Sequence, residues 1–460
     1  MSLVNKLFDD IHQNFDVHKT NKLKYGEVRT DFKLIKMMFD LLPKELLKNP
    51  NLKWCDPCCG NGYFSIYLYF QLLMFQKNGT KKISLKKKHD IINQITMIEI
   101  NEEYNEVLKE TFGEKSKVLQ KDFLTHNEKF DVIIGNPPFN CDGLKKVPTQ
   151  NKISKKNDGK NAWIPFLKHS VESLNDGGYL LFITPSIWMK NDHSCFDWMK
   201  KYKIHKLHTM TNTETNKIFH KQAQTPTCFF LLQKTLSNGW WDDYIFIYDK
   251  YLSTYTKHYY TNKSIPLCGI SIFNKLQPYV KRFNSIDVIK TSIRPSYKSF
   301  KLNDQKTKEF PFPNISTCNL DKLQPTLVIK YSNKELKYKN KTKLVLAHKM
   351  YGFPYLDKGH FGICNRDNYI ILGDEKNLLR LQQFLSTTFC LFLFEATRYR
   401  MKYLEKYIFD LIPNICNICD FPKKINNQTI MDFFKINEIE RKMILGFFKK
   451  KYENFIDKST

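Results

Sequence analysis

Short apolar runs alternate with amphipathic stretches through the first half of the chain. Runs rich in β-branched and aromatic residues predict buried strands at 95–100, 118–124, 130–134, 179–185, 206–210 and 227–232. Between these runs, the apolar positions predict helices over 32–42, 63–75 and 162–174. This alternation of strands and helices is typical of an α/β fold with a doubly wound, Rossmann-like sheet.

The pattern changes after residue 240, where aromatic and basic residues become more frequent. Glycines and aromatics around 351–362 favour hairpins, and apolar spacing favours one helix over 376–407. We therefore predict two domains, residues 1–250 and residues 251–460, of which the second has a mixed α+β structure.

The strand at 130–134 ends in Gly135 and is followed by Asn136-Pro137-Pro138-Phe139. In an open α/β sheet this position, beyond the carboxyl end of a strand, is where ligands bind. Two successive prolines stiffen the backbone and hold an amide, a carbonyl and an aromatic ring in fixed relation. Such a set suits the binding of a flat base through its exocyclic amine. The alternative is an Asn-Pro turn that only closes a core strand.

A second candidate site is the turn between Trp54 and the helix at 63–75. Gly60 and Gly62 allow a positive φ and a close approach of a ligand to the backbone. Backbone N–H groups at the start of the helix favour an anionic group, here a carboxylate. The turn has neither Gly-x-Gly-x-x-Gly nor a Walker lysine, which argues against a dinucleotide or a triphosphate.

Three segments resemble motifs of the S-adenosylmethionine-dependent amino-methyltransferases, chiefly the N6-adenine DNA enzymes. Asn136-Pro-Pro-Phe139 resembles their catalytic motif, and Asp56-Pro-Cys-Cys-Gly-Asn-Gly62 resembles their motif I. Gly26-Glu-Val-Arg-Thr-Asp31 resembles the N-terminal Gly-Glu-Val-Phe-Thr-Pro motif, with Arg29 and Asp31 replacing the aromatic residue and the proline. The order of these motifs is that of the gamma group, which includes Taq-type methylases of type II restriction-modification systems. The resemblance covers roughly residues 24–235 well and the remainder loosely.

The resemblance implies a role for each motif residue. S-adenosylmethionine would be held by Thr30, Asp56, Cys58, Gly60, Gly62, Glu99, Asp122 and Phe123. Within this set, Asp56 would accept from the cofactor's amino group, Glu99 from the ribose hydroxyls and Asp122 from the adenine amine. Catalysis would fall to Asn136, Pro137, Pro138 and Phe139, with Phe139 and Phe219 stacking on the target base. A single acidic residue at a strand end is commonly a helix cap, and Phe219 is equally explained as a core aromatic.

Lys and Arg outnumber Asp and Glu by 73 to 46, which gives a formal net charge of +27. This excess favours a polyanionic partner, taken here as double-stranded DNA, although an AT-rich genome would also raise the lysine content. Candidate DNA contacts are Lys145, Lys146, Lys155, Lys156, Arg366, Arg398 and Arg400. The four lysines lie in a predicted loop over 140–161 that could equally be a solvated surface segment.

The remaining composition argues against several other classes of protein. The 12 cysteines are scattered, without two matching pairs for zinc, so no metal is expected. Neither a signal peptide nor a transmembrane segment is predicted, which favours a reducing, cytoplasmic location without membrane contact. We expect a monomer, with any cognate restriction endonuclease encoded separately.

Pro57-Cys58 superficially matches the nucleophile of cytosine-C5 methyltransferases. It lies in motif I rather than in the catalytic loop, so C5 chemistry is rejected.

The sequence thus predicts a site-specific DNA methyltransferase that acts on adenine N6 after flipping the base out of the duplex. An RNA adenine-N6 or a DNA cytosine-N4 enzyme remains an alternative, because the same loop can bind any amine of this geometry. Some protein-glutamine methyltransferases also carry Asn-Pro-Pro, but the long basic C-terminal half weighs against them. A non-catalytic DNA-binding module is a further alternative, although such a module would be expected to have lost Asp56 or Asn136.

Overall fold

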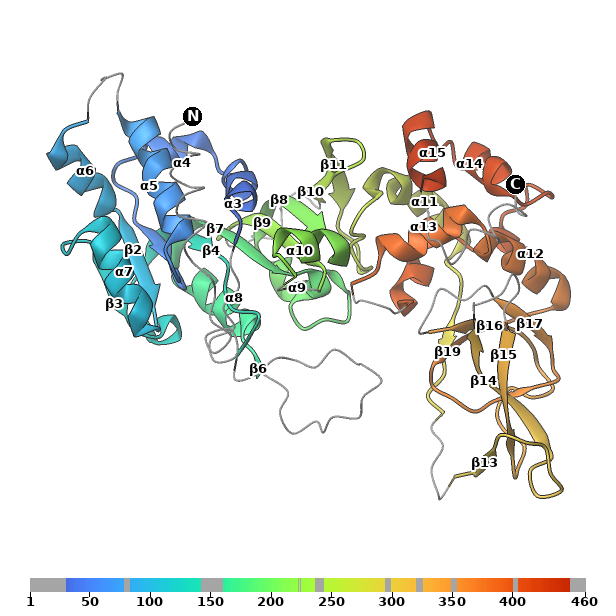
Figure 1. The fold of residues 1–460 in the computed structure, drawn as a ribbon. Coiled ribbons are helices and arrows are strands. Elements are labelled where there is room, and N and C mark those ends of the chain that lie inside the picture. Colours follow the sequence, from blue (N-terminus) through green and yellow to red (C-terminus); the bar gives the residue numbers. More distant parts are fainter. Residues whose placement is uncertain are drawn as a thin grey trace. The chain divides into compact units, whose positions relative to one another are not determined.

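A computed structural model describes residues 30–77, 83–141, 160–221, 223, 225–235, 244–293, 299–319, 326–348, 354–399 and 404–446. The chain divides into two compact units (Figure 1). The first comprises Met1–Trp188 and His193–Tyr248, and the second comprises Met189–Asp192 and Asp249–Thr460. The functions predicted for residues 1–250 and 251–460 remain predictions.

The first unit is built on a mixed sheet with the strand order β10-β8-β9-β7-β4-β1-β2-β3. Strands β7, β4, β1, β2 and β3 are parallel, whereas β9 runs antiparallel to its neighbours β7 and β8. The bounds are β1 (Trp54–Asp56), β2 (Ile95–Glu99), β3 (Lys117–Gln120), β4 (Phe130–Gly135), β7 (Leu174–Pro185), β8 (Lys203–Met210), β9 (Thr227–Gln233) and β10 (Tyr244–Asp249). This architecture confirms the predicted α/β class.

Helices pack on this sheet, α5 and α7 against β2 and α3 and α8 against β7. Polar side chains cap two of them: Asp31 accepts from the Lys33 N–H at the start of α3, and Asn101 accepts from the Glu103 N–H at the start of α7. The bounds are α3 (Phe32–Phe39), α4 (Lys44–Lys48), α5 (Tyr63–Gln76), α6 (Leu85–Ile92), α7 (Glu102–Phe112), α8 (Trp163–Glu172), α9 (Phe196–Met199) and α10 (Asn212–Ile218).

The strand at 118–124 was predicted too long, because β3 ends at Gln120 and residues 123–125 form the 3-10 helix η1 (Phe123–Thr125). The helix predicted over 162–174 ends at Glu172, and Asp176-Gly177-Gly178 lies inside β7. The Gly177 N–H donates to the carbonyl of Lys234, the residue after β9, at 2.6 Å, so backbone hydrogen bonds continue beyond the β7–β9 pairing to the glycines.

The second unit has a mixed α+β structure, with two four-stranded sheets and a helical layer (Figure 1). One sheet has the order β12-β19-β16-β17 and the other β13-β15-β14-β18. Their bounds are β12 (Ile289–Lys290), β13 (Leu302–Asn303), β14 (Phe312–Asn319), β15 (Thr326–Ser332), β16 (Thr342–Ala347), β17 (Tyr355–Lys358), β18 (Gly362–Ile363) and β19 (Asn368–Leu372). Of the predicted hairpins, β16 and β17 form one, while residues 351–353 lie outside the described part of the chain.

The prediction of a single helix over 376–407 is wrong. The structure has α12 (Glu375–Leu385) and α13 (Thr388–Ala396), separated where the Thr387 side chain accepts from the Cys390 N–H and caps the second helix. The other elements of this unit are β11 (Thr254–Tyr259), α11 (Ile270–Phe283), η4 (Lys406–Leu411), η5 (Ile415–Asn417), α14 (Asn427–Phe433) and α15 (Glu438–Leu445). Within the described ranges, no helix combines the length and apolar character needed to cross a membrane.

Candidate active site

Two loops of the first unit meet where β1 and β4 end side by side. The turn after β1 carries Cys58, and the loop after β4 begins with Asn136. The Cys58 Sγ donates to the Asn136 carbonyl oxygen at 3.5 Å, so the predicted motif I turn touches the predicted catalytic loop. Burial, followed by the nearby carboxylate of Asp56, raises the pKa of the Cys58 thiol well above its ordinary value. The thiol therefore stays protonated and is a donor rather than a nucleophile.

The side chain of Asn136 is held in one orientation by Thr30. Its Nδ2 donates to the Thr30 Oγ1 at 3.0 Å, and Thr30 is only 4% exposed. In this orientation the Asn136 Oδ1 is buried, and no hydrogen-bond donor reaches it among the residues that the structure describes. A buried acceptor without a partner costs about 1–3 kcal/mol, which a ligand N–H would recover. The prediction placed Thr30 at the cofactor, and the contact with Asn136 was not anticipated.

The glycine turn has the backbone that its sequence predicts. Gly60 has a φ of 49° and Gly62 a φ of 80°, both in the left-handed region. A Cβ at Gly62 would lie 2.6 Å from the Leu108 Cδ2, so a larger residue would have to displace this side chain and would also be strained at this φ. The helix α5 starts directly after Gly62, which leaves the N–H groups of its first turn without a capping side chain at that position.

Glu99 connects the end of β2 to the glycine turn. Its Oε2 accepts from the Gly60 N–H and its Oε1 from the Asn101 N–H, each at 2.8 Å. Burial raises the pKa of this carboxyl, and the two backbone bonds oppose the rise. Each carboxylate oxygen has a second lone pair, so these bonds leave room for a ribose hydroxyl. The structural role of Glu99 is thus clear, and its cofactor role remains a prediction.

Asp56 is 1% exposed and accepts from the Ser65 Oγ at 2.8 Å. Burial raises its pKa to about 7, against the lowering effect of the Ser65 hydrogen bond. The Oδ1 lies beside the backbone of Gly135, 3.4 Å from where a Cβ would stand. Above a pH of about 7 the Asp56 side chain is a carboxylate, which attracts a cationic group. Ser65 is a polar residue within the apolar helix at 63–75, and this interruption is the signal in the sequence that could have pointed to it.

The remaining residues predicted to bind the cofactor or to stack on the base are mostly engaged in other contacts or buried. Asp122 caps η1 by accepting from the Leu124 N–H at 2.9 Å. Phe123 is 1% exposed, and its ring centroid lies 6.0 Å from that of Phe166. Phe219, at the end of α10, is also 1% exposed, as expected for a core aromatic. Phe139 is half-buried. Their roles toward the cofactor and the target base remain predictions.

The loop after Asn136 leads into a two-stranded ribbon. β5 (Asn140–Cys141) pairs antiparallel with β6 (Lys160–Asn161), and the Ala162 N–H donates to the Phe139 carbonyl at 3.2 Å. This ribbon fixes the backbone immediately after the Asn-Pro-Pro-Phe loop.

Of the predicted DNA contacts, Lys145, Lys146, Lys155, Lys156 and Arg400 lie outside the described residues. In the second unit, the Arg366 side chain is 57% exposed. Arg398 is 14% exposed, and its Nη2 lies 3.0 Å from the Glu395 Oε1. Arg366 is therefore presented to solvent and Arg398 is largely buried in an ion pair.

Residues 62–219, which include Glu99, Asp122 and the Asn136 loop, match the sequence profile of the Eco57I restriction-modification methylase family. The chain is 31% identical over 151 residues to a release factor glutamine methyltransferase of Clostridium botulinum, covering 30% of this chain and 49% of that protein. It is also 31% identical over 184 residues to the type II methyltransferase M.VspI of Vibrio sp., covering 38% of this chain and 40% of that enzyme. The matches thus span about half of these relatives or less.

Among solved structures, the type IIL restriction-modification enzyme MmeI in complex with DNA aligns with 96% of this chain and 77% of its own, at 13% identity and a TM-score of 0.45. The family match rests on the sequence of the first unit, where the Asn136 loop and the acidic strand ends were found. Residues 62–219 are therefore similar in sequence to methylases of the restriction-modification type, and S-adenosylmethionine is the cofactor that this similarity implies.

Proposed function

We propose that the chain methylates the N6 amine of adenine in double-stranded DNA. The observation that carries this proposal is the buried Asn136 Oδ1, an acceptor without a partner in the described structure at the carboxyl end of β4. An exocyclic amine offers two N–H donors, and the neighbouring Pro137 carbonyl would accept the second. The basic composition of the chain, with its net charge of +27, supports a nucleic-acid substrate.

The chemistry follows from the weakness of an aromatic amine as a nucleophile, because its lone pair is delocalised into the ring. Acceptance of both amine hydrogens by Asn136 and Pro137 draws the nitrogen toward tetrahedral geometry and localises that lone pair. S-adenosylmethionine supplies an electrophilic methyl group when bound. The Thr30 hydroxyl keeps the Asn136 Oδ1 directed away from itself, because it already binds the Nδ2. No covalent intermediate with the enzyme is required.

Adenine N6 is enclosed in the duplex, so the base must be flipped out at a cost of a few kcal/mol. Stacking on Phe139 would recover about 1–3 kcal/mol of this cost. Phe139 is the better candidate because it is half-buried and directly follows the prolines, whereas Phe219 is buried. Stacking on Phe219 would require its ring to become exposed.

Protein-glutamine methylation is the second candidate. A glutamine side-chain amide also presents two N–H donors on a flat group, and one of the relatives at 31% identity is a glutamine methyltransferase. The second unit weighs against it, because a peptide glutamine needs no reader of a DNA groove. DNA cytosine-N4 and RNA adenine methylation use the same geometry at Asn136, and a non-catalytic module would leave its unpaired acceptor unexplained.

One experiment separates these candidates. The purified chain is incubated with methyl-labelled S-adenosylmethionine and plasmid DNA, structured RNA or a release factor, and label is measured in each. DNA is then sequenced by a method that reports methylated bases. We expect label in DNA, at adenine N6 within one short sequence. Label in the release factor with none in DNA would overturn the proposal.

Sequence choice is assigned to the region after residue 250, since Arg is the commonest reader of guanine and this region carries the exposed Arg366. Exchange of this region for that of a related enzyme should change which site is methylated while adenine remains the target. A fragment ending near residue 250 should bind S-adenosylmethionine but lose site preference. Full site preference in that fragment would contradict the assignment.

We further propose a monomer that acts with a separately encoded endonuclease. Size-exclusion chromatography would test the monomer, and nuclease assays of the chain would test whether it cleaves DNA itself.

A further inference from the structure

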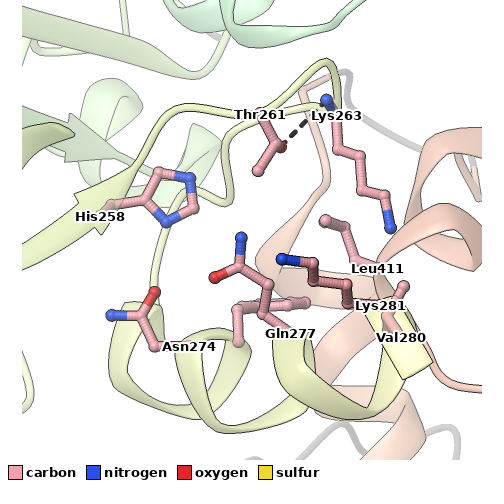
Figure 2. A pocket seen from close by; sticks show the side chains of 9 residues that line it. His258, Thr261, Lys263, Asn274, Gln277, Val280, Lys281 and Leu411 are labelled. Carbon is pink, nitrogen blue, oxygen red and sulfur yellow. Dashed lines mark hydrogen bonds between the residues drawn. The ribbon is translucent and has the colours of Figure 1, made fainter. Parts of the chain in front are cut away.

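A cavity of about 200 Å³ lies inside the second unit, between α11 and the loop that follows β11 (Figure 2). Pockets for drug-sized ligands measure about 300–1,000 Å³, so this one has room for a single ring system. Figure 2 shows the side chains of Gln277 and Lys281 extending from α11 toward the loop with Thr261 and Lys263. The proposed methylation chemistry makes no use of this cavity.

The inner wall is apolar and uncharged. Phe273, Val280 and Leu411 provide carbon surface. His258 is 7% exposed, and burial lowers its pKa to about 4, so its ring is neutral at physiological pH. The interior therefore suits a neutral, flat group rather than a buried ion.

The rim of the cavity is positively charged. Lys281 is exposed on α11, and Lys263 is half-buried on the opposite loop. Burial lowers the pKa of Lys263, whereas the nearby Asp410 raises it and so helps to keep the ammonium charged. Among the described residues that line the cavity, none is acidic. An anionic group at the rim would meet the ammonium groups of Lys281 and Lys263, the second of which also interacts with the Asp410 carboxylate.

Two amides, those of Asn274 and Gln277, are among the described residues that line the cavity. The Asn274 Nδ2 donates to the Lys257 carbonyl at 2.7 Å. Gln277 is half-buried and points its amide into the cavity (Figure 2). An amide offers one acceptor and two donors, which matches the edge of a nucleobase.

We propose that this cavity binds one nucleotide, with the base on the apolar wall, Gln277 at the base edge, and Lys263 and Lys281 at the phosphate. The shared chemistry is a flat heteroaromatic ring joined to a phosphate. Such a ligand can be a free nucleotide or an unpaired nucleotide of a nucleic-acid strand. The site lies within the second unit and is distinct from the Asn136 loop.

The test is a calorimetric titration of the full-length chain with deoxyadenosine monophosphate. S-adenosylhomocysteine is added to saturation so that the cofactor site is filled. The titration is repeated in the Asn136→Ala background, in which the proposed catalytic acceptor is absent. We expect the same nucleotide affinity in both backgrounds. Failure of the methylation proposal would therefore leave this result unchanged.

Variants then locate the site. Gln277→Trp fills the cavity and should abolish binding, and Lys263→Gln and Lys281→Gln should each weaken it about tenfold, the effect of one charge-assisted hydrogen bond. Arg282→Gln is the matched control, since Arg282 is an exposed neighbour on α11 that does not line the cavity. It should bind like the wild type. Absence of nucleotide binding, or unchanged affinity in both lysine variants, would overturn the proposal.

Two further probes define the ligand. Ribose 5-phosphate lacks the base and should bind at least about tenfold more weakly if base burial contributes as expected. Equal affinity for ribose 5-phosphate and for the nucleotide would show that the base does not contribute to binding, which would overturn the proposal. A short single-stranded oligonucleotide that displaces the mononucleotide would identify a strand as the source. Retention of the mononucleotide in its presence would support a free nucleotide.

Discussion

The Asn136 Nδ2 donates to the Thr30 Oγ1 across 106 positions of sequence, so the start of the described chain orients the side chain at the end of β4. This hydrogen bond engages the Nδ2 of the amide and leaves the Oδ1 as an acceptor. Thr30 thus acts on the proposed reaction through Asn136, as a positioning residue.

Replacement of Thr30 by valine keeps the shape of the side chain and removes the hydroxyl. The Asn136 amide would lose its anchor, so we expect kcat to fall about tenfold, the effect of one lost hydrogen bond. Thr30→Ser restores the hydroxyl and should recover most of the rate. Steady-state kinetics check this, and a serine variant as slow as the valine variant would contradict the positioning role.

Asn136→Ala should abolish methyl transfer, because the transition state loses an acceptor with a value of about 1–3 kcal/mol or more. S-adenosylmethionine affinity should change by no more than a few-fold, since the cofactor is assigned to other residues. Methylation assays and calorimetry measure the two effects separately. Asn51→Ala, an exposed asparagine of the same unit, is the control. Full activity in the Asn136 variant would exclude the catalytic role.

Cofactor affinity should depend on pH through Asp56, whose pKa is raised to about 7 by burial. Below this value the carboxyl is neutral and above it is a carboxylate that attracts the cofactor's ammonium group. Affinity should therefore increase as the pH rises from 6 toward 7.5, before the amino group itself titrates at about 7.7–8.0. Calorimetry across this range should show a weak, flat profile in Asp56→Asn. Falling affinity over the same range would contradict the assignment.

The same raised pKa affects the stability of the ligand-free chain. The folded state binds the Asp56 proton more tightly than the unfolded state, whose carboxyl has its ordinary value of 3.8. The free energy of unfolding should therefore decrease as the pH rises from 3.8 to about 7. Asp56→Asn removes this contribution, and urea titrations at several pH values would detect a shallower dependence.

Glu99→Ala and Asp122→Ala should both weaken S-adenosylmethionine binding, but with different effects on stability. Glu99 also holds the Gly60 and Asn101 N–H groups, so its loss should lower the unfolding free energy by about 1–3 kcal/mol. Asp122 makes a helix cap with a value of about 0.5–2 kcal/mol. Calorimetry and thermal melts report both effects, with the exposed Glu106→Ala as control. Unchanged cofactor affinity in both variants would mean that these strand ends do not bind it.

DNA binding should weaken steeply with salt, with a log–log slope of about −0.9 for each phosphate neutralised. Replacement of Lys145, Lys146, Lys155 and Lys156 by glutamine should flatten this slope, as measured by fluorescence anisotropy. A control that replaces Lys86, Lys88, Lys115 and Lys117 removes the same charge elsewhere in the first unit. An equal slope in the wild type and the loop variant would show that these lysines do not contact DNA.

The sequence was sufficient where a local pattern determines the structure. The strand ending at Gly135 and the helix after Gly62 are buried apolar runs with clear ends, and both were predicted closely. The contacts of Glu99 with Gly60 and of Ser65 with Asp56 were not, because they join residues that only folding brings together. The break before α13 was missed because threonine can occur inside a helix. Its role as the N-cap of α13 depends on a hydrogen bond to the Cys390 N–H that exists only in the folded backbone.

The pairing of β5 with β6 has a consequence for how this domain can change. In sequence, residues 142–159 join Cys141 to Lys160, two positions that are paired with each other. Doubling the number of residues in such a connection adds only about 0.6 kcal/mol of loop-closure entropy. The segment can therefore be lengthened, shortened or exchanged between homologues while the backbone at Phe139 keeps its anchor on Ala162. Evolution or protein engineering can therefore change the residues between Cys141 and Lys160, next to the candidate active site, without moving the backbone at Phe139.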